Sequence, residues 1–150
     1  LPSAPSRASD DALQNVKTNP VDALLSMQVV YRLVVTLVFA AFVIALSVTP
    51  GIGRSGDNVF AWLFASTSTP VQKILHIVSY AILSLLWSWT FASVASIKMR
   101  SVLALLLSLG LGVALEWYQT QVPGRFGTIT DVLLNAIGAV IGLALAIVIL

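Results

Sequence analysis

The stretch SVLALLLSLGLGVALEWYQTQVPGRFGTITDVLLNAIGAVIGLALAIVIL, residues 101–150, contains two long apolar runs separated by a short polar segment. Each run is close to the roughly 20 residues that an α-helix needs to cross a bilayer. The polar segment contains Pro123-Gly124, a pair that ends helices and favours turns. The stretch therefore predicts two membrane-spanning helices, 101–119 and 131–150, joined by a short connection.

Two further apolar runs precede this stretch, at residues 29–48 and 74–95. Of the 150 residues, 58% are hydrophobic and 9% are charged, and the mean hydropathy is +0.96, whereas an average soluble domain has about a quarter charged residues. Inside lipid every backbone polar group needs a partner, and continuous apolar runs meet that need as helices rather than as the alternating strands of a barrel. We therefore predict an all-α integral membrane protein with four transmembrane helices in a compact bundle.

Composition also excludes several classes of function. The net charge is only +2 at pH 7, which is too small an excess to indicate nucleic-acid binding. The chain contains no cysteine and a single histidine, which excludes disulfides and thiolate chemistry and leaves a thin set of metal ligands. It also lacks a phosphate-binding loop and a dinucleotide fingerprint. We predict no cofactor, no metal and no nucleic-acid partner, and a lipid bilayer as the environment.

The segments outside the apolar runs carry further predictions. Residues 1–26 are rich in Ser, Ala, Pro and Asp, so we predict a disordered N-terminal tail followed by one transmembrane domain at 27–150. Met27 directly precedes the first run, and we hypothesise that the working protein begins near it. The connection 49–73 contains the apolar segment NVFAWLFA at 58–65. That segment is too short to span, and two interpretations are open, an interfacial segment or an ordinary loop.

Positive charges are divided unequally between the two predicted faces of the membrane. Five lie on the face of the N-terminus and of the turn between the second and third spans: Arg7, Lys17, Arg32, Lys98 and Arg100. Three lie on the opposite face: Arg54, Lys73 and Arg125. Because Lys and Arg concentrate in cytoplasmic loops, we predict that both termini are cytoplasmic. Lys98 and Arg100 are then topology determinants first, with binding of anionic lipid as a second role.

Polar residues near the spans converge on the face opposite the termini. Successive spans run in opposite directions, so the second span begins, the third ends and the fourth begins on that face. The polar residues at these places, and in the connection between the last two spans, are Lys73, His76, Tyr80, Glu116, Gln119, Arg125, Asp131 and Asn135. Within each span their spacing puts them on one side of the helix. We predict that they form a ligand-binding pocket open to the outer face.

Glu116 is the most costly of these residues, because it lies inside its apolar run. A charge at the bilayer centre costs about 2.5–3.5 kcal/mol on insertion scales, and less near the end of a span. Such groups normally face the bundle interior and find partners there. We predict that Glu116 faces His76 or Arg125. The alternative roles of Arg125 are to pair with Asp131 or to clamp an anionic group of a ligand.

Other candidates also have a structural and a functional interpretation. His76 is either a hydrogen-bonded packing residue or a general base oriented by Glu116. Asp131 is the N-cap of the fourth span, with Thr130 as its rival, or a site residue, and the two roles are compatible. Lys73 is either an interfacial anchor or a ligand for phosphate.

Small residues line the faces of the third and fourth spans that carry these polar groups. They are Ser108, Gly112, Gly138 and Gly142. Small residues at this spacing let the backbones of neighbouring helices approach each other. We interpret them as packing residues that shape the wall of the site and take no part in its chemistry.

Two motifs in the chain resemble those of the VanZ-like membrane proteins. One is K-x2-H-x3-Y, at Lys73, His76 and Tyr80, and the other is E-x2-Q-x3-P-G-R-x5-D-x3-N-x2-G-x3-G, at residues 116–142. The ending of the first span, Ser47-Val-Thr49-Pro50, is also similar, and the resemblance covers most of residues 30–150. The chain departs from the family at Gln72, where members often have Asp. The carboxylate that this Asp would place beside Lys73 and His76 is therefore missing.

The resemblance implies a multi-pass envelope protein of the bacterial inner membrane, and the namesake of the family is associated with low-level resistance to glycopeptide antibiotics such as teicoplanin. Three functions stay open. The first is binding of an amphiphilic, anionic or peptidic ligand, either a lipid-linked cell-wall intermediate or the glycopeptide itself. The second is an intramembrane enzyme for a lipid-linked substrate, with His76 and Glu116 as acid and base. The third is an accessory subunit of a membrane complex, in which the same residues only hold helices together.

Overall fold

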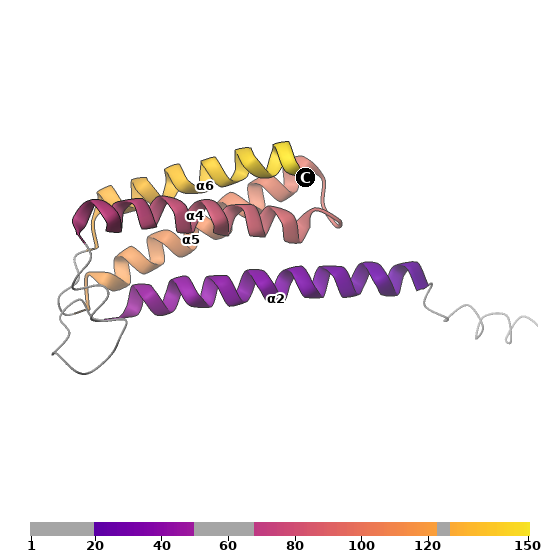
Figure 1. The fold of residues 1–150 in the computed structure, drawn as a ribbon, viewed down its shortest axis with the longest axis horizontal. Coiled ribbons are helices and arrows are strands. Elements are labelled where there is room, and N and C mark those ends of the chain that lie inside the picture. Colours follow the sequence, from indigo (N-terminus) through magenta and orange to yellow (C-terminus); the bar gives the residue numbers. More distant parts are fainter. Residues whose placement is uncertain (1–19, 50–67, 123–126) are drawn as a thin grey trace, which may run out of the picture.

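The computed structural model of the chain describes residues 20–49, 68–122 and 127–150, with side chains from residue 25 onwards. The helices of these segments are α2 (Pro20–Val48), α4 (Thr69–Phe91), α5 (Ile97–Gln119) and α6 (Ile129–Ile149). Each is long and apolar enough to cross a membrane. They pack against one another (Figure 1). The predicted all-α membrane protein with four transmembrane helices in a bundle is thus confirmed.

Helix ends differ from the predicted spans because local capping, and not hydropathy, sets them. The predicted second span, 74–95, corresponds to the helix Thr69–Phe91. Its N-cap is Ser68 and its first turn contains Pro70, both favoured at the start of a helix. Ser96 then caps α5. The apolar residues just before Ser96 therefore belong to the turn between the two helices.

The helix α2 begins at Pro20, before the predicted span 29–48. The predicted start of the transmembrane domain, Met27, falls inside this helix and stays a prediction. Residues 1–19 lie outside the described part of the chain, and so do residues 50–67, which include the NVFAWLFA segment.

Helices that follow one another in the sequence run in alternating directions along the bundle (Figure 1). The helices α4 and α6 run parallel to each other and antiparallel to α2 and α5. As a result α4 begins, α5 ends and α6 begins at one end of the bundle, which we call the site end. The other end, where residues 92–96 join α4 to α5, is called the turn end. The convergence predicted from the order of the spans is present at the site end.

The helices α4 and α6 pack with their backbones in direct contact. A Cβ atom on Gly138 would overlap the carbonyl oxygen of Ile77, and one on Gly142 would overlap that of Ala81. Only glycine allows this approach, so the predicted packing role of these two residues is confirmed. This contact fixes the rotation of α6 and thereby decides which of its side chains face α5.

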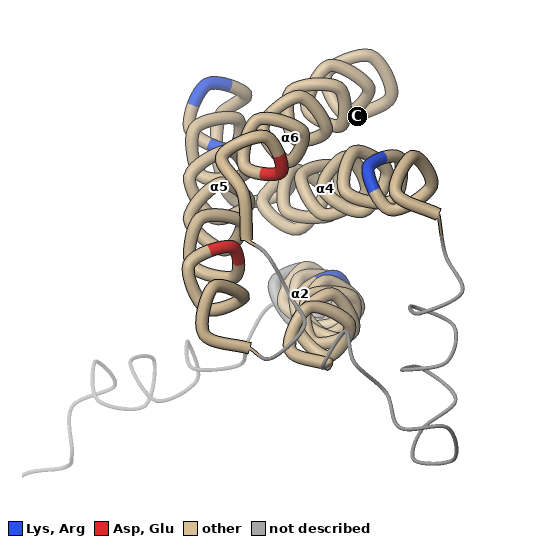
Figure 2. The backbone as a smooth tube through the Cα atoms, turned by 90° about the vertical axis from the view of Figure 1, so that its left-hand side faces the viewer, with Lys and Arg blue, Asp and Glu red and all other residues tan. Residues whose placement is uncertain are grey.

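The bundle has an apolar core and an apolar outer surface. Buried side chains at the centre include Val43, Leu83 and Leu115. Large apolar side chains also cover the outside; Leu106 is 64% exposed and Val148 is 84% exposed. Charged positions are few along the helices (Figure 2). A surface of this kind suits contact with lipid tails, and polar groups then belong inside the bundle.

Polar contacts join α2 to α4 near the turn end. The hydroxyl oxygens of Thr36 and Thr90 lie 2.8 Å apart. Nη1 of Arg32 donates to the backbone oxygen of Trp89 at 3.3 Å, and the guanidinium carbon lies 5.2 Å from the centre of the Trp89 ring. Arg32 thus has both a hydrogen-bond acceptor and an aromatic partner on α4.

Candidate functional site

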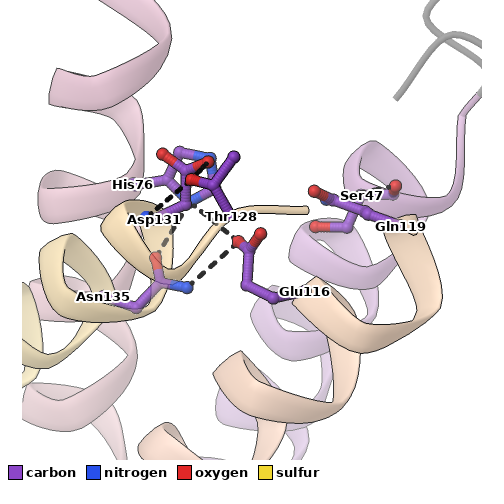
Figure 3. Close-up of polar contacts among 7 residues, drawn as sticks. All are labelled: Ser47, His76, Glu116, Gln119, Thr128, Asp131 and Asn135. Carbon is purple, nitrogen blue, oxygen red and sulfur yellow. Dashed lines mark hydrogen bonds and ion pairs between the residues drawn. The ribbon is translucent and has the colours of Figure 1, made fainter. Parts of the chain in front are cut away.

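Three helices each supply one group to a polar cluster at the site end (Figure 3). His76 comes from α4, Glu116 from α5 and Asn135 from α6. Nδ1 of His76 lies 2.9 Å from Oδ1 of Asn135 and 3.6 Å from Oε1 of Glu116. The amide nitrogen of Asn135 donates to the same oxygen of Glu116 at 3.4 Å. The predicted approach of Glu116 to His76 is therefore confirmed, and Asn135 lies between them.

The hydrogen bonds of Asn135 define the state of the His76 ring. An amide oxygen can only accept a hydrogen bond, so Nδ1 of His76 is the donor in the contact with Oδ1. A neutral imidazole has one N–H, so its other nitrogen, Nε2, is then an acceptor. The cluster presents this second nitrogen as a base or as a hydrogen-bond acceptor.

Burial divides the cluster into an enclosed part and an accessible part. Asn135 is 1% exposed and Glu116 is 4% exposed, whereas the His76 side chain is 23% exposed. Oε2 of Glu116 is buried without a hydrogen-bond partner among the described residues. His76 is therefore the accessible member of the cluster, and Glu116 and Asn135 are enclosed behind it.

Two glycines allow the cluster to close. A Cβ atom on Gly112 would lie 3.1 Å from Cε1 of Tyr80 and 3.3 Å from Nδ2 of Asn135. A Cβ atom on Gly127 would overlap the backbone oxygen of Glu116. Gly127 thus brings the start of α6 against the end of α5, which a larger residue would prevent.

The start of α6 is capped by Thr128, so the prediction of Asp131 or Thr130 as the N-cap is wrong. The backbone N–H of Asp131 donates to Oγ1 of Thr128 at 3.2 Å. The Thr128 hydroxyl donates in turn to the Asp131 carboxylate at 2.6 Å. Asp131 therefore lies in the first turn, where a negative charge is favourable. These reciprocal bonds hold the first turn of the helix that carries Asn135.

Gln119 links the site end of α5 to α2. Its side-chain nitrogen donates to the backbone oxygen of Ser47 at 3.3 Å, and the residue is 5% exposed. Ser47 lies near the end of α2, which is otherwise the helix with the fewest contacts to α5. This hydrogen bond joins the end of α5 to the end of α2 beside the cluster.

A cavity of about 190 Å³ lies beside the cluster, between α2, α4 and α5. Its lining residues are Phe42, Val43, Leu46, Ser47, Gln72, Leu75, His76, Ser79, Tyr80 and Gln119. One part of the wall is apolar and comes mainly from α2, and the other part is polar and comes from α4 and α5. His76 belongs both to the cavity wall and to the cluster with Asn135 and Glu116.

A protein-family model described as VanZ/LLP1 matches residues 14–150. The chain belongs to the VanZ/LLP1 family. The resemblance seen in the two motifs is thereby confirmed, and with the four spanning helices it identifies a multi-pass membrane protein. Comparisons with curated proteins and with solved structures found no significant match.

The residues of the family motifs do not all meet at one point. Those that lie in the cluster or line the cavity are His76, Tyr80, Glu116, Gln119 and Asn135. Lys73 is exposed, with no hydrogen bond or ion pair to the described residues. Asp131 is occupied with Thr128, and Arg125 lies outside the described part of the chain. The ligand roles of all eight residues stay predictions.

Gln72, the departure from the family pattern, lies on the cavity wall. At this position the chain has an uncharged amide, where the resemblance to the family led us to expect a carboxylate. The cavity lining contains no carboxylate, and Glu116 is separated from it by His76. The lining contains no Lys or Arg either, so a charged ligand group of either sign would find no counter-ion there and the cavity favours uncharged groups.

Several contributors to the site were not predicted. Thr128 could have been found, because Thr-x-x-Asp before an apolar run is a capping signature. Gly127, and the apolar cavity residues of α2 such as Leu46, gave no signal that distinguishes them from ordinary loop and lipid-facing residues. In the described segments, no three His, Cys, Asp or Glu residues come together in a way that could hold a metal ion.

Proposed function

We propose that this VanZ/LLP1-family protein binds one end of an amphiphilic molecule in the cavity between α2, α4 and α5, at the outer face of the bacterial inner membrane. The observation that carries the proposal is the two-sided wall of this cavity. Phe42, Val43 and Leu46 offer an apolar surface, and His76 and Gln119 lie opposite with polar groups. Sites for small ligands commonly combine an apolar lining with a few placed polar groups.

The size of the cavity limits the ligand. Drug-sized ligands occupy pockets of roughly 300–1,000 Å³, whereas this cavity measures about 190 Å³. A whole glycopeptide antibiotic does not fit. A segment of a lipid-linked cell-wall intermediate fits better, because its chain can continue between the helices into the bilayer. The antibiotic resistance that the family resemblance implies would then come from binding of that intermediate by the protein, and not from binding of the antibiotic.

Polar contacts would orient the bound segment. His76 is held through Nδ1 by Asn135, so its Nε2 is the acceptor available to a hydroxyl or amide N–H of the ligand. An uncharged ligand group suits a lining without Lys, Arg, Asp or Glu. The buried Glu116 also holds the imidazole, because its Oε1 lies 3.6 Å from Nδ1 and accepts a hydrogen bond from the same Asn135 amide.

A second candidate function is catalysis on a lipid-linked substrate. The observation in its favour is that Asn135 and Glu116 hold Nδ1 of His76, a residue of the cavity wall, so that its Nε2 has no partner among the described residues. Such a ring can act as a general base. The cavity wall also contains the hydroxyls of Ser47, Ser79 and Tyr80. None of them forms a hydrogen bond with His76 in the described part of the chain, so the attacking group would be a water or a hydroxyl of the substrate. The third candidate, an accessory subunit, needs no open cavity.

Lipids retained by purified protein test the proposal. In the variant Leu46→Trp the indole fills the cavity, and we expect the bound amphiphile to be lost, as measured by mass spectrometry of extracted lipids. The matched control is Leu106→Trp, on the lipid-facing side of α5, which should retain it. Cells that express the two variants should differ in teicoplanin susceptibility in the same way.

Equal lipid content in Leu46→Trp and the wild-type protein would rule out this cavity as the binding site. The variant His76→Gln separates the first two functions. A binding protein would lose affinity partially, whereas an enzyme would retain the ligand and accumulate it unreacted. An accessory subunit would show the same lipids in all variants and a change in the co-purified protein partner.

A further inference from the structure

Arg100 lies in the first turn of α5, at the turn end of the bundle and far from the site just described. It is 6% exposed, and its Nε atom is buried without a hydrogen-bond partner. A guanidinium has five N–H donors and remains charged at any physiological pH. A buried arginine without a partner is therefore an unusual feature that calls for a ligand.

The other arginine of the described segments provides a direct comparison. Arg32, also near the turn end, donates to the backbone oxygen of Trp89 and lies over its ring. Arg100 has no such contact, although it is the more buried of the two. The helices can therefore supply an arginine with a hydrogen-bond acceptor and an aromatic partner, as they do for Arg32, but they supply neither to Arg100.

A second unpartnered group lies at the same level. Ser88 precedes the end of α4 at Phe91 by three residues, and Arg100 follows the start of α5 at Ile97 by three residues. The two helices are joined by a turn, so these positions are at similar depth. The hydroxyl of Ser88 is buried and has no hydrogen-bond partner. Ser88 is thus a second unpartnered polar group near the turn end.

Charge excludes an internal counter-ion among the described side chains. Their acidic residues, Glu116 and Asp131, both lie at the site end, and Oε1 of Glu116 lies 3.6 Å from Nδ1 of His76. An unpaired buried cation is strongly unfavourable in a membrane protein. The positive end of the α5 dipole adds to the potential at this point. Lys98, which is exposed on the same turn, extends it to the surface.

We propose that Arg100 binds a phosphate group at the turn end of the bundle. The planar guanidinium matches phosphate oxygens, and basic sites between helices at the cytoplasmic face bind anionic lipid head groups. The phosphate belongs either to an anionic phospholipid or to a free anion in solution. This second site is independent of the cavity at the site end.

The test uses the full chain in bilayer discs of phosphatidylcholine, whose choline cation compensates its own phosphate. One arm adds phosphatidylglycerol to the discs, and the other adds inorganic phosphate to the buffer. Binding raises the unfolding temperature, because a ligand that binds only the folded state stabilises it. Either anion should stabilise the wild-type protein, and the arm that responds identifies the source of the phosphate.

The key variant is Arg100→Met, and its control is Lys98→Gln, which removes an exposed positive charge from the same turn. We expect Arg100→Met to weaken the response to the anion at least about tenfold, as expected for loss of a charge-assisted contact, and Lys98→Gln to retain most of it. In phosphatidylcholine alone Arg100→Met should unfold at the same temperature as wild type or higher, because it replaces an unpaired buried charge by an apolar side chain.

Two results would overturn the proposal. One is the absence of stabilisation of the wild-type protein by either anion. The other is an equal loss of response in Arg100→Met and Lys98→Gln, which would indicate general surface charge. If Arg100→Met fails to fold, Arg100→Lys takes its place; it keeps the charge without the planar fork and should give an intermediate response.

Discussion

At the scale of single residues, Asn135 links the two other members of the polar cluster, His76 and Glu116. It is 1% exposed and uses both ends of its amide, one toward His76 and one toward Glu116. A carboxylate and an imidazole alone could meet in several arrangements. With the amide bonded to both, Nδ1 of His76 is the donor to Asn135 and Oε1 of Glu116 is the acceptor from it, and His76 also lines the cavity.

Replacement of Asn135 by alanine tests this role. Asn135→Ala leaves Nδ1 of His76 and Oε1 of Glu116 without their amide partner inside the bundle. We expect the free energy of unfolding to fall by about 1–3 kcal/mol, the usual cost of unpaired buried polar groups. Reversible unfolding in mixed detergent micelles provides the measurement.

The matched control is Ser108→Ala on α5. Ser108 is also fully buried, but its hydroxyl has no hydrogen-bond partner among the described residues. Its removal should leave the unfolding free energy unchanged or slightly higher. Equal losses in Asn135→Ala and Ser108→Ala would mean that the hydrogen bonds of Asn135 do not stabilise the bundle.

At the scale of helices, the close contact between α4 and α6 positions the site. Gly138 and Gly142 face carbonyl groups of α4 and leave no space for a side chain. Because both contacts are made by one face of α6, they set its rotation as well as its distance. Asn135, one turn before Gly138, is then directed toward His76 and Glu116.

The variant Gly142→Ala tests this contact. The added methyl would overlap the carbonyl oxygen of Ala81, so α6 must move away from α4. We expect a loss of about 1–3 kcal/mol in unfolding free energy, the usual cost of overpacking, and weaker binding in the distant cavity. Gly110→Ala is the control, because nothing lies within 4 Å of the added atom.

Gly110→Ala should stabilise the protein by roughly 1 kcal/mol, since alanine is the better helix former. Replacement of glycine by alanine is thus expected to lower the free energy of unfolding at Gly142 on α6 and to raise it at Gly110 on α5. A stabilising effect of Gly142→Ala would show that α4 and α6 are farther apart in the membrane than in this structure.

At the scale of the whole molecule, the alternating direction of the helices places two groups of polar residues at opposite ends of the bundle. The cavity and the cluster lie at the site end, and the unpartnered Arg100 lies at the turn end. The excess of Lys and Arg on the side of the turn favours the cytoplasm for that end. We infer that the cavity opens to the outside of the cell.

Cysteine labelling tests the orientation, because the chain contains no cysteine of its own. Gln121→Cys introduces a thiol at the site end, and Val94→Cys introduces one in the exposed turn at the other end. A membrane-impermeant maleimide added to intact cells should label only Gln121→Cys. Labelling of Val94→Cys alone would reverse the orientation and place the cavity in the cytoplasm.

The order of the spans was sufficient to predict that Glu116 and His76 approach each other, but not that Lys73 and Asp131 would stay outside the cluster. Consecutive spans alternate in direction, so Glu116 and His76 had to share one end of the bundle. The spacing did not indicate that Asn135 would stand between them, because that depends on the rotation of α6. Capping was misassigned to Asp131 or Thr130, since the apolar run begins later than the helix, which Thr128 caps.

The sequence by itself determined the class of the protein, the number of spans and the end at which the polar groups gather. These properties depend on sums over about 20 consecutive residues, which a local apolar run contains in full. Only the tertiary structure decided the order of the hydrogen bonds through Asn135, the cavity beside His76 and the unpartnered state of Arg100. Each of these depends on how far every helix is rotated and how closely it approaches its neighbours. Contacts such as that of Gly142 with Ala81 set both quantities between residues far apart in the chain.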